Sequence, residues 1–207
     1  MDIRPQIKEM HGEERYSDVT LRYSGQEIKA HQVVLAANSS YFAKVFDGSF
    51  KEASTKVLEL HEDDRLALSG LIAMKYGHEA HSLQWFRANT KSELSEDRAS
   101  TQHVLYLVDL YAVAQKYLVK QASDKVLETF DERYGLLFGA PAAMWREIVE
   151  YVYVVHAETA STLRNCVVAQ WVRYQGSERV VKQSETAQAL VAQAPDFAVD
   201  VLTALGW

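Results

Sequence analysis

The fold is decided by residues 16–53, which read YSDVTLRYSGQEIKAHQVVLAANSSYFAKVFDGSFKEA. Apolar and polar residues alternate over 19–23, which is typical of a half-buried strand, and Ser24-Gly25 supplies a turn into a second strand over 26–30. The apolar spacing then lengthens to three and four residues. This change predicts two short helices separated near Asn38, with Ser39 or Ser40 as the cap of the second.

The remaining chain predicts one more strand and then helices. Residues 56–60 indicate the strand, and Asp63 or Asp64 is placed to start a helix whose apolar face is Leu68, Leu71, Ile72 and Tyr76. Residues 77–101 are polar and predict a loop insertion, which Trp85 and Phe86 would tack down. Apolar stripes predict helices from there to the C terminus. The first long stripe comprises Val104, Leu107, Val108, Tyr111, Ala114 and Leu118. Two later helix faces comprise Trp145, Ile148, Val149 and Val152, and Leu163, Val167, Trp171 and Tyr174. Two short helices follow, one over 185–193 and one that begins at Pro195. The order predicts a segregated α+β protein.

Composition excludes several classes of function. The net charge of −6 and the pI near 5.7 argue against a surface that binds the phosphates of nucleic acid. A single cysteine, Cys166, rules out a disulfide framework and a cysteine-rich zinc site, and predicts a small buried hydrophobe. We expect no secretory signal and no membrane span, and therefore a cytoplasmic or nuclear protein.

The motifs of catalysis are missing from the sequence. No phosphate-binding glycine loop and no G-x-S-x-G elbow occurs. His78 and His81 lack further ligands nearby, which favours a solvated loop over zinc. The carboxylates at 62–64 are explained by the dipole of the following helix, and His31 is predicted to be a hydrogen-bonded structural histidine. We therefore predict no enzyme, no cofactor, no metal and no small-molecule substrate.

A family resemblance rests on these residues. Residues 16–53 resemble the start of a BTB/POZ domain, through Asp18, Val19, His31, Leu35, Ser39, Phe42 and Phe46. Residues 109–130 (DLYAVAQKYLVKQASDKVLETF) resemble its later helix pair, through Tyr111, Ala112, Ala114, Lys116 and Tyr117. The C-terminal part is similar to the helical tail of short stand-alone BTB proteins of filamentous fungi.

The resemblance implies a BTB/POZ fold, in which helices flank a small mixed sheet and a helical extension follows. We predict an N-terminal segment over 1–15, the BTB/POZ domain over 16–130 with an acidic loop insertion at 77–101, and the extension over 131–207.

The resemblance implies a protein-interaction module, since BTB domains commonly self-associate or connect substrates to a cullin-3 ubiquitin ligase. Cullin-3 adaptors carry a hydrophobic-x-Glu motif after the paired-aromatic helix, and Phe50-Lys51-Glu52 fits it. We predict a contact surface for cullin-3 made of Phe46, Phe50, Glu52 and Tyr117. In the alternative interpretation, Phe50 folds inward as a core residue and Glu52 faces water.

Homodimerisation is a second expectation from the resemblance. In one branch of the family, the aspartate that begins the first strand pairs with a basic residue directly after the histidine. This chain keeps Asp18 and His31 but has Gln32 at the basic position, so that polar arrangement is altered. The alternative function is therefore a self-associating scaffold or transcriptional co-regulator with no ligase link.

Overall fold

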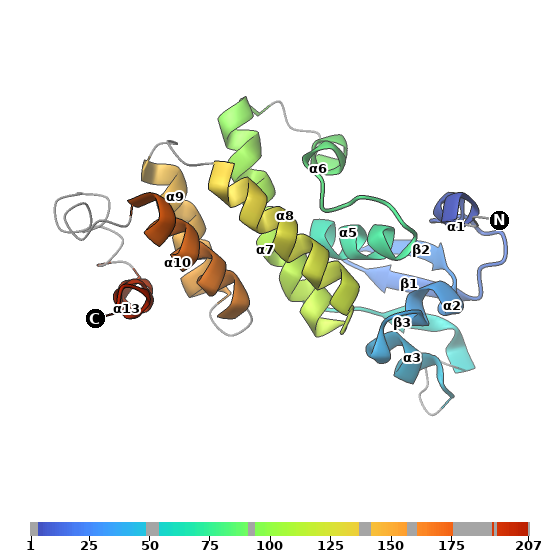
Figure 1. The fold of residues 1–207 in the computed structure, drawn as a ribbon. Coiled ribbons are helices and arrows are strands. Elements are labelled where there is room, and N and C mark those ends of the chain that lie inside the picture. The colour runs from blue at the N-terminus through green and yellow to red at the C-terminus, as the bar shows by residue number, and fades with distance from the viewer. Residues whose placement is uncertain are drawn as a thin grey trace. The chain divides into compact units, whose positions relative to one another are not determined.

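The computed structural model describes residues 4–48, 54–90, 94–136, 142–156, 161–175, 192 and 194–206 (Figure 1). The chain forms two compact units. The first unit contains Met1–Lys91 and Asp109–Val126, and the second contains Ser92–Val108 and Leu127–Trp207. Two helices, α7 (Glu96–Lys116) and α8 (Lys120–Leu136), contribute residues to both units.

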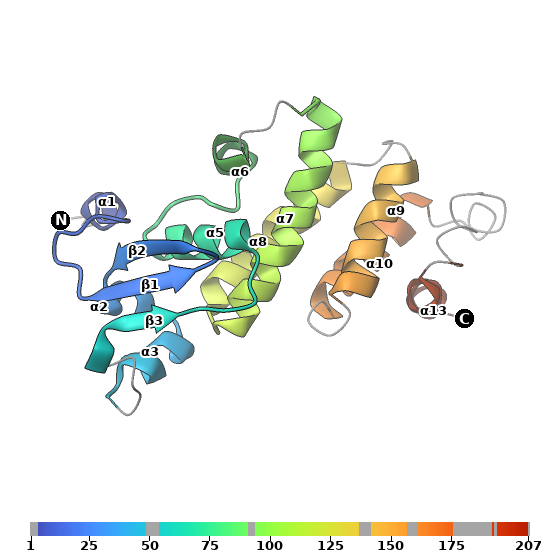
Figure 2. The ribbon, with the colours of Figure 1, turned by 180° about the vertical axis from the view of Figure 1, so that it is seen from behind.

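The first unit is built on a three-stranded mixed sheet of order β2-β1-β3. Strand β1 (Val19–Tyr23) pairs antiparallel with β2 (Gln26–Ala30) and parallel with β3 (Val57–Glu59). The inner face of β1 is buried through Val19, Leu21 and Tyr23, as the alternation predicted. In Figure 2 the other face of the sheet is toward the viewer and α5 (Arg65–Lys75) lies behind the sheet. The α+β fold with a small mixed sheet is confirmed.

The hairpin turn is specified by two left-handed residues. Ser24 has φ 46° and Gly25 has φ 74°, the combination that a type I′ turn needs. The twist of such a turn matches the twist of the two strands, and it fixes the register in which Tyr23 faces Gln26.

The first unit also contains short helices, and two of them begin at caps that were among the candidates from the sequence. They are α1 (Arg4–Glu9), α2 (Gln32–Ala36), α3 (Ser40–Phe46), α5 and α6 (Leu83–Thr90). Ser39 caps α3, because its Oγ accepts the backbone N–H of Phe42 at 3.2 Å. Asp64 caps α5 by accepting the N–H of Ala67 at 2.8 Å. Helix α5 buries the apolar face that was predicted for it, with Leu68, Leu71, Ile72 and Tyr76 inside.

The prediction of a loop at 77–101 is wrong for much of that stretch. Helix α6 occupies residues 83–90, and α7 has begun by Glu96. Phe86 is buried, as expected of a ring that tacks this segment down. Ser82 Oγ accepts the N–H of Trp85 at 3.2 Å and starts α6. The stretch looked like a loop because a helix that buries one ring leaves most of its side chains polar.

Leu118 is a second correction. The sequence placed it on the buried stripe of the first long helix, but its side chain is 53% exposed and its φ is 53°. The N–H of Leu118 bonds to Gln115 and that of Val119 bonds to Ala114 at 2.9 Å, which is the hydrogen-bond pattern of a Schellman helix end. Leu118 therefore ends α7 in a backbone conformation that glycine more often occupies.

The second unit is helical. It contains α9 (Ala142–Glu150), the five-residue π-helical turn η1 (Tyr151–Val155), α10 (Ser161–Gln175) and α13 (Pro195–Ala204), with parts of α7 and α8. The predicted faces of α9 and α10 are buried, and Pro195 begins α13 as predicted. The side chain of Tyr174, expected on the α10 face, and the short helix expected at 185–193, apart from residue 192, lie outside the described part of the chain.

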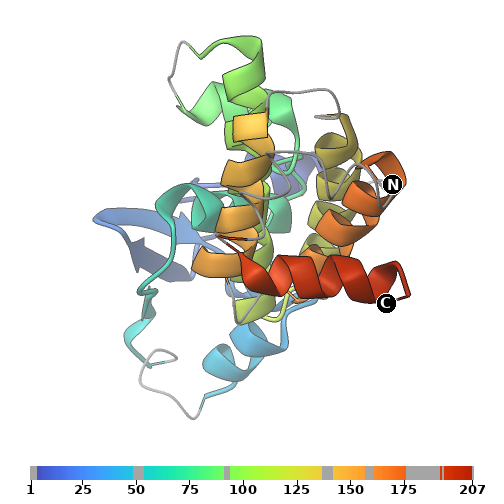
Figure 3. The same cartoon turned by 90° about the vertical axis from the view of Figure 1, so that its left-hand side faces the viewer.

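An aromatic cluster holds the C-terminal helix of this unit. Trp171 of α10 meets Trp145 of α9 and Phe197 of α13 edge to face, with centroid distances of 6.0 and 5.5 Å. Tyr153 of η1 donates a hydrogen bond to Asp200 at 2.7 Å. Figure 3 shows α13 running across the axes of α9 and α10.

Candidate protein-interaction surface

Helix α3 carries Phe46, the first of the predicted contact residues, and is packed into the core of the first unit through Phe42. Phe42 is buried and stacks on the half-buried ring of Phe46 at a centroid distance of 6.3 Å. Because one ring is inside and the next reaches the surface, Phe46 presents apolar area on a helix that cannot easily shift. Phe46 is thus placed where a partner can reach it.

Tyr117 is a core residue, and its prediction as a contact residue is wrong. Its side chain is 1% exposed, and its ring stacks on Phe42 at 5.4 Å and meets Tyr41 edge to face at 4.9 Å. Ser39 Oγ donates to the carbonyl of Tyr117 at 2.8 Å. Tyr117 therefore joins the start of α3 to the end of α7 and fixes the position of α3 from inside the core.

A buried carboxylate completes this junction. Asp63 is only 4% exposed at its side chain, and it accepts from Lys116 Nζ at 2.8 Å and from Tyr117 Oη at 2.5 Å. Lys116 also donates to the carbonyl of His61 at 2.8 Å. Burial and the neighbouring Asp63 raise the pKa of Tyr117 far above its usual range, so its hydroxyl stays a donor. Asp63 thus connects the segment before α5 to the end of α7. The sequence did not indicate this role, because Asp64 by itself explains where α5 begins.

His31 has the structural role predicted for it. It is buried, its backbone N–H donates to the hydroxyl of Tyr76 at 3.0 Å, and its Nδ1 lies 2.9 Å from the same oxygen. Its Nε2 lies 2.9 Å from the carbonyl of Arg15. These contacts satisfy the tautomer in which Nε2 donates to Arg15 and Nδ1 accepts from Tyr76.

Asp18 and Gln32 are bonded to each other. The Asp18 carboxylate accepts the backbone N–H of Gln32 at 2.7 Å, and the Gln32 side-chain amide donates to the Asp18 carbonyl at 3.1 Å. The carboxylate thus satisfies the first N–H of α2, which its own cap residue His31 leaves without a side-chain bond. This pair ties the start of β1 to the start of α2.

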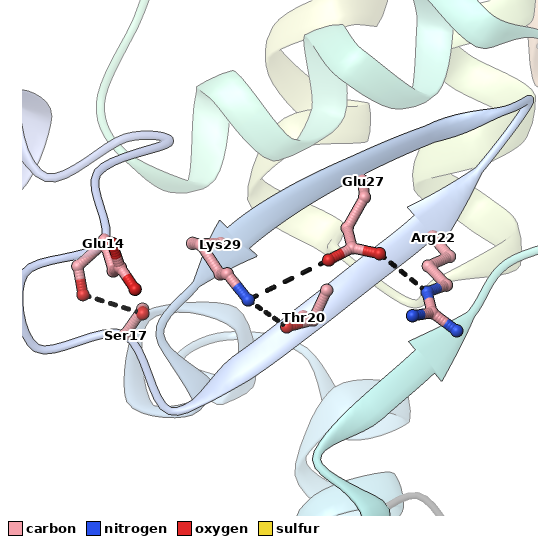
Figure 4. Close-up of polar contacts among 6 residues, drawn as sticks. All are labelled: Glu14, Ser17, Thr20, Arg22, Glu27 and Lys29. Atoms are coloured by element: carbon pink, nitrogen blue, oxygen red, sulfur yellow. Dashed lines mark hydrogen bonds and ion pairs between the residues drawn. The ribbon is translucent and has the colours of Figure 1, made fainter.

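The outer face of the sheet carries several charged side chains. Glu27 pairs with Arg22 at 2.9 Å and lies 3.9 Å from Lys29, which also donates to Thr20 Oγ1 at 3.1 Å (Figure 4). All three charged side chains are about half exposed, so these pairs contribute little to stability. Apolar contact with a partner is better offered by α3 than by this face.

The comparison with known proteins identifies the family of this chain. The BTB/POZ domain family matches residues 7–133, more than half of the chain. The chain belongs to the BTB/POZ domain family. A BTB/POZ domain is a protein-interaction module, so the general function of this chain is interaction with proteins.

Curated relatives of this BTB/POZ protein carry the same domain within much longer chains. Kelch-like protein 3 of Homo sapiens is 37% identical over 70 residues, which cover 34% of this chain and 12% of the relative. Kelch-like protein 21 of Danio rerio is 37% identical over 70 residues, covering 34% and 11%. Kelch repeat and BTB domain-containing protein 4 of Mus musculus is 27% identical over 108 residues, covering 52% and 19%. The chain thus spans less than a fifth of the length of these relatives, and its resemblance to fungal proteins stays a prediction.

Two predicted contact residues of the BTB/POZ protein, Phe50 and Glu52, lie outside the described residues. The described chain stops at Gly48, after α3 has ended at Phe46, and resumes at Ser54 before β3. The choice between an outward and an inward Phe50 therefore stays open, as does the prediction for Glu52.

Cys166 carries the single thiol of the BTB/POZ protein. Burial, aided by Asp131, raises the pKa of the Cys166 thiol to about 11, so little thiolate exists at neutral pH. Among the described residues, no three His, Cys, Asp or Glu side chains gather as a metal site would require. No helix in the described part of the chain has the length and apolar content to cross a membrane. His78, expected in a solvated loop, packs instead against His11, with ring centroids 5.0 Å apart.

Proposed function

We propose that this chain is an adaptor that binds the N-terminal helical region of cullin-3 through α3 and the segment after it. The observation that carries the proposal is the half-buried Phe46 on a helix anchored through Phe42 and Tyr117, directly before the Phe50-Lys51-Glu52 motif. The resemblance to BTB adaptors supplies the partner. An aromatic ring that loses water on binding provides affinity, and a neighbouring carboxylate provides orientation. We further propose that the protein acts in the cytoplasm or nucleus, as is typical of BTB proteins.

A titration with the N-terminal region of cullin-3 tests the proposal. We expect micromolar or tighter binding to the wild type, and binding at least about tenfold weaker for Phe50→Ala/Glu52→Ala, because the loss of a central contact typically exceeds 1.4 kcal/mol. Lys51→Ala is the matched control and should bind as the wild type does. Isothermal titration calorimetry gives the dissociation constants, and thermal unfolding checks that the variants remain folded. If the wild type does not bind at tens of micromolar, the cullin-3 proposal is refuted.

A homodimeric scaffold is the second candidate, and a specific exposed pair supports it. Tyr16 is 72% exposed and Val33 is 75% exposed, and they flank the bonded pair of Asp18 and Gln32. The resemblance assigns the neighbourhood of Asp18 and Gln32 to dimer contacts. Two copies that meet there would remove both apolar side chains from water.

Light scattering tests the homodimer. We expect the mass of two chains in the micromolar range, and we expect Val33→Asp to give single chains, because burying an unpaired charge disfavours the contact. Val199→Asp, on an exposed residue of α13, is the control and should leave the mass unchanged. A wild type that scatters as one chain at every concentration refutes the homodimer.

A further inference from the structure

The N-terminal strap, which we define as residues 4–17, contacts the rest of the first unit through the His11 ring, the backbone of Lys8 and the carbonyl of Arg15. Most of its side chains are exposed, whereas His11 is half-buried and stacks on Tyr76 with a centroid distance of 5.1 Å and an interplanar angle of 23°. Tyr76 itself is completely buried. The ring of His78 also packs against His11, with the two ring centroids 5.0 Å apart.

Two parts of the strap, His11 and Arg15, lead to Tyr76. His11 covers the ring directly, whereas Arg15 is held through His31, whose Nε2 lies 2.9 Å from the Arg15 carbonyl. His31 is in turn 2.9 Å from the Tyr76 hydroxyl through its Nδ1. The Arg15 end leads directly into β1, so it is fixed by the sheet as well. The His11 end is the one that can leave while the sheet stays intact.

The environment of His78 favours an uncharged imidazole. Its Nε2 is buried and has no hydrogen-bond partner in the described part of the chain, and its other contact is a hydrogen bond to the backbone of Lys8 on the strap. A neutral ring tolerates this, because an unprotonated nitrogen can keep its lone pair unshared at modest cost. A protonated ring would place a second N–H and a positive charge in a site with no acceptor.

We infer that the N-terminal strap is a proton-controlled latch: acid charges His11 and His78, and residues 4–12 then leave Tyr76 while the sheet of the first unit stays folded. The positive charge of Lys8 acts on His78, and that of a protonated His78 would act on His11. The strap's own carboxylates, Glu9, Glu13 and Glu14, are exposed to water. On the other side, the negative charge of Asp18 acts on Tyr76, which stays protonated.

The direction of the pH dependence follows from the perturbed histidines. Burial, and then His78, lower the pKa of His11 from 6.5 to about 4, and burial, and then Lys8, lower the pKa of His78. A group with a lowered histidine pKa stabilises the attached state above pH 6.5, and this stabilisation is lost as the pH falls toward 4. For His11 alone, the attachment equilibrium should weaken about 30-fold between pH 7.5 and pH 5.0.

Solution NMR on the full chain tests the latch. At pH 7.5 we expect nuclear Overhauser contacts between the ring protons of His11 and Tyr76. These contacts should disappear with a midpoint between pH 6.5 and pH 4, and the amide shifts of residues 5–12 should move to values typical of unfolded chain. The amide signals of β1 should stay at their native positions over the same range.

Two variants separate the latch from general acid unfolding. His11→Phe keeps an aromatic ring for the stack but cannot take up a proton, so its strap should stay attached to lower pH. His61→Phe changes a mostly exposed imidazole of the same unit and should titrate as the wild type does. The proposal is overturned if the wild-type contacts persist to pH 4, if β1 unfolds together with the strap, or if His11→Phe releases with the wild-type midpoint.

Discussion

Replacing Lys116 with methionine will lower the free energy of unfolding by about 3 kcal/mol. Asp63 would keep its place in a site where its side chain is 4% exposed, and only the hydroxyl of Tyr117 would remain to balance it. A carboxylate that is buried without its cationic partner retains the cost of leaving water and loses the attraction that offset it. The carbonyl of His61 would also lose its donor.

Urea unfolding measures this loss, and the chain offers a matched control. Lys120→Met removes a lysine from an ion pair with Asp124 in which both side chains are mostly exposed, so it should cost about 0.5 kcal/mol or less. The double variant Lys116→Met/Asp63→Asn removes the uncompensated charge and should recover at least about 1 kcal/mol relative to Lys116→Met. Equal losses for Lys116→Met and Lys120→Met would contradict the structural role given to Asp63.

The parts of the fold that were predicted correctly are those that neighbouring residues determine. The hairpin at Ser24-Gly25 depends on residues only a few positions apart, and so do the caps, which the sequence narrowed to Ser39 or Ser40 and to Asp63 or Asp64. The buried faces of the long helices follow from their apolar period in the same way. Local chemistry was sufficient for these elements.

The candidate surface was harder to predict because its geometry depends on residues that are far apart in the chain. Tyr117 looked like a contact residue beside α3, but its burial follows from Asp63 and Phe42, which lie 54 and 75 positions earlier. Helix α6 was missed because a helix held by one buried ring shows little apolar period. Only the packing of the folded chain decides that Tyr117 is buried while Phe46 reaches the surface.

Replacing Trp171 with alanine will destabilise the second unit by about 3 to 5 kcal/mol. Trp171 is 2% exposed and makes edge-to-face contacts with Trp145 and Phe197. The substitution removes the ring that α9 and α13 share, and the remaining cavity cannot be filled by the two aromatics without moving a helix. Because α13 is held through Phe197 and through Asp200, it should loosen first.

Hydrogen exchange resolves the effect by region, which matters because the two units need not unfold together. We expect amides of α10 and α13 to lose protection in Trp171→Ala, and the β1 amides to keep most of theirs. Trp171→Phe retains an aromatic ring and should lose about half as much stability. Val199→Ala truncates an exposed side chain of α13 and should change little. A loss below about 1 kcal/mol in Trp171→Ala would mean that the cluster does not hold the second unit, and that α13 depends on the bond between Tyr153 and Asp200 instead.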